Sequence, residues 1–398
     1  MDRSNLLRRA PLVIAAAVLA ASCSSSGGGG SGAPSSTQGA VGTDAATGTS
    51  ASGVASASGP LAFTEAGPYP VGTVELDTPN GPVTVWYPGE PGQEAGRERA
   101  TYDMRSFLPA TEQPKVADAT SVVHTTDAYP ELPAAQPSGQ PFPLVLFSHG
   151  FCGFRQQSSF LTTAIASWGF VVAAPEHAAS DLSACLAGTF GQGASTTVED
   201  LRAAIPVLEA ESLRDEGPLA TIIDTGRVAV VGQSLGGSAA IEMSGDPEVV
   251  TFVALAAGGG SAPPAKPGLF VAGDADVVAP AATVEQWWNT SVPSPKQLAV
   301  LGGVTHLGFT DVCTIALEQG GVVPIVASAG VAVPDVITKL YAAGCDPSLT
   351  PATAAWPAIR HLTIAQLRSA FGMDPAPVGL DPSVADAYEG LTVRYQSA

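Results

Sequence analysis

The stretch Val228-Ala-Val-Val-Gly-Gln-Ser-Leu-Gly-Gly-Ser-Ala-Ala-Ile-Glu-Met243 decides the fold. An apolar run typical of a buried strand leads through Gly232-Gln-Ser-Leu-Gly236 into residues that favour a helix. In this G-x-S-x-G spacing the two glycines leave room at a sharp turn, which lifts the hydroxyl of Ser234 above the edge of a sheet. The N–H of Leu235 then lies at the helix start, where it can face an oxyanion. The stretch predicts an active serine nucleophile rather than a purely structural glycine turn.

Apolar strand patterns alternate with helical patterns on both sides of this stretch. Strands are expected at 71–76, 83–87, 143–148, 170–174, 250–256, 269–272 and 297–301, and helices at 157–168, 197–208 and 281–288. The turn sequence Pro79-Asn-Gly-Pro82 makes the first two strands antiparallel. The later alternation predicts an α/β fold with a mostly parallel sheet covered by helices on both faces. The active site of such a sheet lies at the carboxyl ends of its strands.

A reactive serine requires a general base, and five histidines are available. In proteins with this strand–turn–helix nucleophile, the acid and the histidine follow the serine along the chain. His124 is expected to be a surface residue, and the chain order excludes His149 and His177, which leaves His306 and His361. His306 follows the strand expected at 297–301 and so lies at the catalytic edge, whereas His361 suits a place flanking a helix. His306 is therefore predicted to take the proton of Ser234.

The acid that orients His306 should leave a strand between the serine and the histidine. Gly273-Asp274-Ala-Asp276 offers two carboxylates after the strand expected at 269–272. Asp274 leaves the strand directly and suits a turn-capping role beside glycine. Asp276 can reach over the sheet edge and is the preferred acid, with Asp274 as the alternative.

A second oxyanion donor is expected after the strand at 143–148. The turn Ser148-His-Gly-Phe151 can present the N–H of Phe151 beside that of Leu235. The imidazole of His149 is expected to be packed or hydrogen-bonded rather than catalytic. The aromatic rings of Phe154, Phe190 and Phe309 fit either an acyl pocket or the protein core.

The region Phe142–Phe309 resembles bacterial α/β-hydrolases of the dienelactone-hydrolase-like group, which are similar to platelet-activating factor acetylhydrolase and to cutinase-like polyesterases. The resemblance is carried by PFPLVLFSHGFCGFRQQSSF, SWGFVVAAPEH, DTGRVAVVGQSLGG, Gly273-x-x-Asp276 and Thr305-His-Leu-Gly-Phe309. It implies an α/β-hydrolase fold and a Ser-His-Asp ester hydrolase without a metal or organic cofactor.

Three positions depart from members of this group. Gln233 replaces the histidine that often precedes the nucleophile, and Ser234 replaces the cysteine of true dienelactone hydrolases. In animal acetylhydrolases the acid follows the strand directly after the nucleophile, but Leu255-Ala-Ala-Gly-Gly-Gly-Ser261 contains no carboxylate. The resemblance on this point is to the polyesterase type.

The N-terminal segment is expected to direct export. Residues 1–22 combine three arginines with a short apolar run, as a signal peptide does. Ala20-Ala-Ser-Cys23 resembles a bacterial lipobox, which predicts lipidation of Cys23, with ordinary cleavage and secretion as the alternative. Residues 23–59 have the Ser/Gly-rich composition of a disordered tether, and 60–398 form the catalytic domain. The protein is then an envelope lipoprotein on the outer face of the membrane.

The net charge limits the possible partners, and the cysteine content indicates disulfides rather than a metal site. Loss of the signal segment, with its three arginines and one aspartate, changes the net charge from −19 to −21, which argues against nucleic acid. The four remaining cysteines favour disulfides in an exported chain, and the sequential pairs Cys152–Cys185 and Cys313–Cys345 are preferred. No C-x-x-C spacing indicates a metal site.

The sequence as a whole predicts an exported, monomeric serine hydrolase for a small-molecule, lipid or polymer ester. The alternative is a solute-binding or scaffold lipoprotein that keeps the fold without turnover, because a fold alone does not determine a function.

Overall fold

The structure, a computed structural model, describes residues 58–290 and 293–398. The predicted signal segment, the lipidation site Cys23 and nearly all of the 23–59 tether lie outside the described residues. The expected catalytic domain from residue 60 falls within the compact unit Val54–Ala398.

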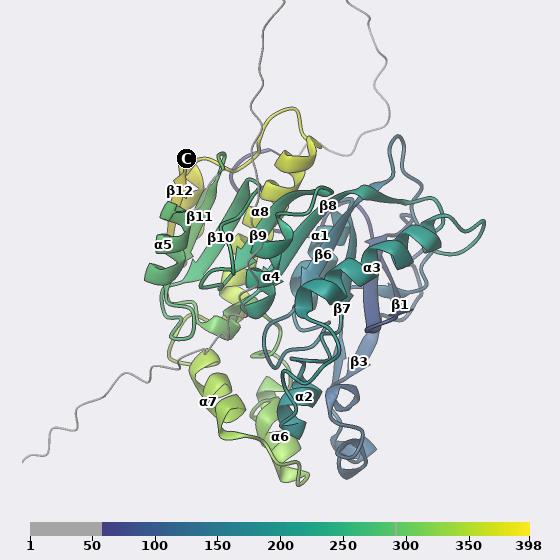
Figure 1. The fold of residues 1–398 in the computed structure, drawn as a ribbon, viewed down its shortest axis with the longest axis vertical. Helices are drawn as coiled ribbons and strands as arrows, with labels where there is room; N and C mark the ends of the chain where they lie inside the picture. The colour runs from purple at the N-terminus through teal and green to yellow at the C-terminus, as the bar shows by residue number, and fades with distance from the viewer. Residues whose placement is uncertain (1–57, 291–292) are drawn as a thin grey trace, which may run out of the picture. The chain divides into compact units, whose positions relative to one another are not determined.

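A ten-stranded sheet forms the centre of this unit, with the order β12-β11-β10-β9-β8-β6-β7-β2-β1-β5 (Figure 1). The strands are β1 Val71–Thr78, β2 Gly81–Pro88, β5 Tyr129–Pro130, β6 Phe142–Ser148, β7 Val171–Pro175, β8 Ile223–Gln233, β9 Val249–Leu255, β10 Gly268–Gly273, β11 Gln297–Leu301 and β12 Val393–Ser397. Six adjacent strands are parallel to one another, in the order β7, β6, β8, β9, β10 and β11. Antiparallel strands flank this parallel block: β2 pairs with β7 at one edge, and β12 pairs with β11 at the other. Two further strands, β3 Thr101–Asp103 and β4 Val123–Thr125, form a separate pair.

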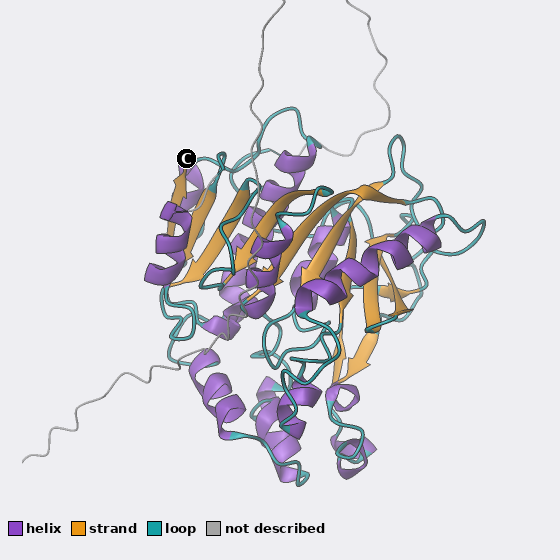
Figure 2. Cartoon of the chain, viewed as in Figure 1, coloured by secondary structure: helices purple, strands orange, loops and turns teal. Residues whose placement is uncertain are grey.

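Helices cover both faces of the sheet (Figure 2). The helices are α1 Ser159–Ser167, α2 Leu182–Ala187, α3 Thr197–Ser212, α4 Leu235–Met243, α5 Ala281–Thr290, α6 Val322–Ser328, α7 Asp335–Gly344 and α8 Ala352–Phe371. Along β6, Val145 and Phe147 pack in one core with α1 and α8, and Leu144 and Leu146 pack in the other with α3, α4 and α5. This alternation is the period-two pattern of a strand buried on both faces. The arrangement is that of the α/β-hydrolase fold, as the sequence predicts.

The structure corrects the sequence-based boundaries in several places. The helix expected at 197–208 continues to Ser212 with Pro206 inside it, and its start is fixed by a capping box between Thr196 and Glu199. His361 does not flank a helix but lies in the middle of α8, where it is fully buried and accepts a hydrogen bond from the Phe63 N–H. The helices α2, α6, α7 and α8 and the edge strand β12 were not anticipated.

Two disulfides join Cys152 to Cys185 and Cys313 to Cys345, which is the sequential pairing expected from the sequence. Such bonds persist in oxidising compartments outside the cytoplasm. None of the helices within residues 58–290 and 293–398 has the length and apolar character needed to cross a membrane.

Candidate active site

The turn between β8 and α4 holds Ser234 in a strained conformation. Its φ is +56° and its ψ −117°, outside the regions that most residues adopt. The two flanking glycines make this geometry possible: a Cβ on Gly232 would overlap the carbonyl of Gly236, and a Cβ on Gly236 would overlap that of Ser148. The half-buried side chain of Ser234 therefore stands at the carboxyl end of β8, as the G-x-S-x-G spacing predicts.

His306 lies between the serine and an acid. It opens the 3-10 helix η4, His306–Phe309, directly after β11. Its Nε2 is 2.9 Å from Ser234 Oγ, and its Nδ1 is 2.8 Å from Asp276 Oδ2. The other carboxylate oxygen of Asp276 accepts hydrogen bonds from the N–H groups of Val278 and Ala279, both at 2.8 Å. The acid is fixed from both sides, so it can hold the imidazole in one orientation.

Asp274 occupies a different place. It is exposed, and its Oδ1 accepts a hydrogen bond from the N–H of Gly303 at 2.5 Å. This contact joins the loop after β10 to the loop after β11, so Asp274 has a structural role here, although it bridges two loops rather than capping its own turn. Of the two carboxylates considered from the sequence, only Asp276 is recorded in contact with His306 within the described residues.

The turn after β6 brings a second backbone donor to the site. Phe151 lines the opening at Ser234, Leu235 follows Ser234 in the chain, and each of the two is more than one-third exposed. Within residues 58–290 and 293–398, neither of their N–H groups donates to another protein atom. Free N–H groups next to a nucleophile are the donors that an oxyanion requires.

The turn that carries Phe151 is fastened to the loop before α2. Cys152 has a φ of +57°, donates its N–H to the carbonyl of Ser180 at 2.8 Å and is bonded to Cys185 in α2. Gly153 forms a bridge with Asp181, whose carboxylate caps α2 through the N–H of Ala184. These contacts hold the turn that carries the proposed oxyanion donor in place.

Two buried glutamines were not anticipated as part of the site. Gln157 Nε2 donates to Gln233 Oε1 at 3.0 Å, and Gln233 Nε2 donates to the carbonyl of His306 at 3.2 Å. A Cβ on Gly150 would overlap Gln233 Oε1, and one on Gly153 would overlap Gln157 Oε1, so both amides lie directly beneath the oxyanion turn. Gln233 stands within the nucleophile motif, and its polar side chain at the end of an apolar run is the one sequence feature that could have indicated a role for it, although not its partner Gln157.

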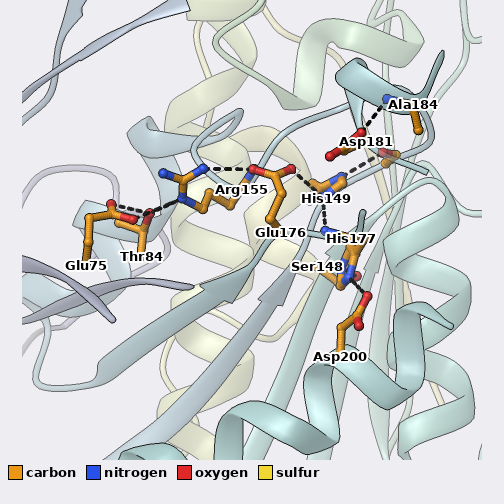
Figure 3. A network of polar contacts seen from close by, with 11 residues as sticks. Glu75, Thr84, Ser148, His149, Arg155, Glu176, His177, Asp181, Ala184 and Asp200 are labelled. Carbon is orange, nitrogen blue, oxygen red and sulfur yellow. Dashed lines mark hydrogen bonds and ion pairs between the residues drawn. The ribbon is translucent and has the colours of Figure 1, made fainter. Parts of the chain in front are cut away.

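A second Ser-His-Asp set, made by Ser148, His177 and Asp200, lies at the end of β6 (Figure 3). Ser148 Oγ is 2.9 Å from His177 Nε2, and His177 Nδ1 is 3.0 Å from Asp200 Oδ2. All three side chains are at most 1% exposed, so no substrate reaches this serine. Burial, followed by the neighbouring His149, lowers the pKa of His177 to about 4, which keeps its ring neutral near pH 7. This set fastens the end of β6 to the loop after β7 and to α3.

A chain of polar contacts leads from His177 of this buried set to Glu75 in β1 (Figure 3). His149 is buried, with Nδ1 2.9 Å from the carbonyl of Gly150 and Nε2 accepting the N–H of His177. Glu176 lies beside this ring and pairs with Arg155 at 2.9 Å, and Arg155 reaches Glu75 in β1 at 3.1 Å. The imidazole of His149 is therefore hydrogen-bonded in the interior, as expected.

A pocket opens at Ser234 and His306 and continues beneath three short helices. Its lining comes from the oxyanion turn, α2, α6, α7 and residues near the 3-10 helix η1, Met104–Phe107. Phe154 lines it, whereas Phe309 belongs to the main core. Phe190 is exposed and packs edge-to-face on Phe151, with 5.5 Å between ring centroids. The three aromatic side chains considered from the sequence thus have three different roles.

The segment that contains α6 and α7 is fixed close to His306. The Cys313–Cys345 disulfide closes the segment, and the hydroxyl of Thr305 donates to the carbonyl of Gly344. Asp311, fully buried, accepts hydrogen bonds from Ser159 and from the N–H of Phe160 at the start of α1. The loop after His306 is thereby attached to α1 on one side and to α7 on the other.

The family model described as platelet-activating factor acetylhydrolase, isoform II, matches residues 115–217. The matched part, about a quarter of the chain, includes β6, the oxyanion turn, α1, β7 and α3. It ends before Ser234, Asp276 and His306. No curated protein matches the chain significantly. In the part of the chain that the structure describes, no group of three or more His, Cys, Asp or Glu side chains is placed to hold a metal ion.

Proposed function

We propose that the protein is a serine hydrolase of carboxylic esters, with Ser234 as nucleophile, His306 as general base and Asp276 as the acid that orients it. The observation that carries this proposal is the position of His306, whose two ring nitrogens lie 2.9 Å from Ser234 Oγ and 2.8 Å from Asp276 Oδ2. A serine alone is a weak nucleophile, and an adjacent base that is itself oriented by a third group activates it. The matched family model supports the same class of reaction, because its description names an acetylhydrolase.

In the first half of the reaction, Ser234 Oγ attacks the ester carbonyl while His306 Nε2 accepts its proton. The carbonyl oxygen becomes an oxyanion, which the N–H groups of Phe151 and Leu235 stabilise. Asp276 stabilises the imidazolium that forms. The C–O bond to the alcohol then breaks, His306 returns the proton to the leaving alkoxide, and an acyl ester remains on Ser234.

In the second half, water replaces the alcohol. His306 Nε2 takes a proton from this water as its oxygen attacks the acyl carbon, and the same two N–H groups hold the second oxyanion. Collapse of this intermediate releases the carboxylic acid and returns the proton to Ser234 Oγ. No residue beyond the triad and the two amides is needed to balance the protons.

The substrate that the site supports best is an ester with an apolar portion. The pocket that opens at Ser234 is lined almost entirely by aliphatic and aromatic side chains, among them the exposed Phe151, and Leu235, which follows Ser234 in the chain, is also exposed. Exposed apolar side chains that gather around a cavity are typical of binding sites. A lipid or polymer ester fits these surroundings better than a charged soluble ester does.

We further propose that the mature protein starts at a lipidated Cys23 and works outside the cytoplasm. The lipobox-like Ala20-Ala-Ser-Cys23 and the two disulfides support this location. Mass spectrometry of the mature N-terminus should find a diacylated cysteine, whereas an unmodified N-terminus after residue 22 would indicate a secreted enzyme.

Hydrolysis of p-nitrophenyl acetate tests the proposed function. The wild-type protein should hydrolyse it, and Ser234→Ala and His306→Ala should each lose about 10⁴-fold or more, because triad members act as a unit. Ser148→Ala, which removes the serine of the buried second set, is the matched control and should lower stability while keeping turnover. Absence of hydrolysis by the wild-type protein would favour the non-catalytic scaffold, and wild-type turnover in Ser234→Ala would refute the assignment.

A further inference from the structure

The pocket extends from the reacting atoms into a separate layer of short helices. α2, α6 and α7 lie together beyond the end of the sheet where β6 and β8 finish (Figure 1). Apolar residues of α2 and α6 belong to two small clusters that are distinct from the two main cores. Neither disulfide lies in a main core, and each ties this layer to the catalytic loops. The helices are thus held against the site rather than packed on the sheet.

The α7 helix presents two different faces. Ile337, Leu340 and Tyr341 line the pocket, with the i, i+3, i+4 spacing of one helix face. Lys339 and Ala342 lie on the opposite face and are exposed. In α6, Val322, Val323 and Val326 also line the pocket, and Val326 follows the other two by four and three residues, which places them on one helix face. The inner wall made by these two helices therefore carries no charged side chain.

The chemistry of the lining limits what it binds. Apart from Ser234 and His306, its polar side chains are only Gln157, Gln233 and Tyr341, and the two glutamine amides are engaged with each other. A charged substituent in this pocket would lose its hydration without gaining a partner. Burial of a hydrocarbon chain contributes up to about 0.8 kcal/mol of binding free energy for each CH₂, which raises the binding constant about fourfold.

We propose that this pocket holds the acyl chain of an aliphatic ester, so that the enzyme selects esters of medium or long unbranched fatty acids. This inference rests on the proposed function and deepens it. The acyl group stays bound to Ser234 through both halves of the reaction, whereas the alcohol must leave and water must enter. An acyl chain beneath α6 and α7 leaves the exposed mouth near Leu235 free for this exchange. The alcohol portion is held only at the rim.

Two series of esters test which portion enters the pocket. The first keeps the p-nitrophenyl leaving group and lengthens the acyl chain from acetate to laurate, and the second keeps acetate and lengthens an alkyl alcohol. We expect kcat/KM to rise with acyl length, by up to about fourfold for each methylene, until the pocket is filled. Alcohol length should have a much smaller effect. A flat acyl profile, or a rise only with alcohol length, would overturn the inference.

Variants on the two faces of α7 locate the chain. Leu340→Glu places a carboxylate in the lining and should lower the ratio of decanoate to acetate kcat/KM by at least tenfold. Ala342→Glu adds the same charge on the exposed face of α7 and should leave this ratio unchanged. Val323→Trp, which fills the pocket from α6 without a charge, should move the preferred acyl chain to a shorter length. An unchanged ratio in both Leu340→Glu and Val323→Trp would exclude the pocket as the acyl site.

A binding measurement separates this inference from the proposed function. Ser234→Ala should still bind a fluorescent long-chain fatty acid, and Leu340→Glu in that background should weaken the binding by at least tenfold. Binding without hydrolysis by the wild-type protein would refute the proposed function alone. Acetate hydrolysis that depends on Ser234, without chain binding, would refute the acyl pocket alone.

Discussion

The residue next to the nucleophile holds the backbone of the base: Gln233 Nε2 donates to the carbonyl of His306 at 3.2 Å. The same side chain accepts from Gln157 at the other end, and it lies beneath Gly150 in the oxyanion turn. Gln233 is therefore next to the nucleophile in the chain, hydrogen-bonded to the backbone of the base, and in place beneath the oxyanion turn. A side chain in this position sets the separation between the base and the oxyanion donors.

Gln233→Glu is expected to lower kcat by about 10- to 100-fold with little change in KM, because displacement of catalytic groups weakens transition-state binding. Glutamate has the same shape but cannot donate to the His306 carbonyl. Steady-state kinetics on p-nitrophenyl esters measure both constants, and Gln192→Glu, at an exposed position, is the matched control. A wild-type kcat in Gln233→Glu would show that this contact has no role in positioning.

Asp276→Asn is expected to lower kcat by about 10⁴-fold, because an amide favours the wrong tautomer of the neighbouring imidazole. Asp274→Asn should stay within about threefold of wild type, since an asparagine oxygen can still accept from the N–H of Gly303, a contact of 2.5 Å in the structure. Comparison of the two variants on one ester is sufficient. The reverse ranking would identify Asp274 as the acid.

The two disulfides are expected to have different effects. Each closes a loop of 32 or 33 residues, for which chain entropy suggests roughly 3 to 4 kcal/mol. Replacing Cys152 and Cys185 by serine should lower kcat in protein that remains folded, because it frees the turn that carries Phe151. Replacing Cys313 and Cys345 should mainly lower the melting temperature.

Paired measurements of melting temperature and of kcat at a temperature where both variants are folded distinguish these effects. Equal losses of kcat in the two double variants would contradict a specific role for the Cys152–Cys185 bond.

Asp311 is expected to make stability depend on pH. Burial raises its pKa from 3.8 to about 7, although hydrogen bonds from Ser159 and Phe160 oppose the rise. A raised pKa means that the folded state favours the protonated carboxyl, so this stabilisation is complete below about pH 3.8 and is lost as the pH rises through about 7. The melting temperature of wild type relative to Asp311→Asn should therefore fall between pH 4 and pH 8.

Thermal unfolding of both proteins across this range checks the prediction, with Asp335→Asn on the exposed side of α7 as control. A constant difference between wild type and Asp311→Asn would show that Asp311 does not titrate in this interval.

The sequence predicts the sheet and its carboxyl edge well because buried strands and G-x-S-x-G are local signals. The expected strand 297–301 coincides with β11, and the candidates Ser234 and His306 lie in contact. The bond between Gln157 and Gln233 spans 76 residues and has no local signal. Likewise, α6 and α7 line a pocket rather than pack on the sheet, so the alternating strand and helix patterns in the sequence do not predict them.

The second Ser-His-Asp set shows a different limit of sequence analysis. Ser148, His177 and Asp200 have the residue types and the contacts of a triad, but they are completely enclosed. Chain order excluded His177 as the base, whereas its real role depends on burial, which only the fold determines. Residue types alone do not separate a reactive set from a structural one.

Covalent labelling tests the central claim, that Ser234 is the nucleophile, most directly. The protein is treated with an alkyl fluorophosphonate, and intact mass and peptide mass spectrometry determine how many labels bind and where. We predict one label for each chain, on the peptide that contains Ser234, with loss of the label in Ser234→Ala and strong slowing in His306→Ala. A label on Ser148 or another residue, or no label on a folded wild-type protein, would contradict the account.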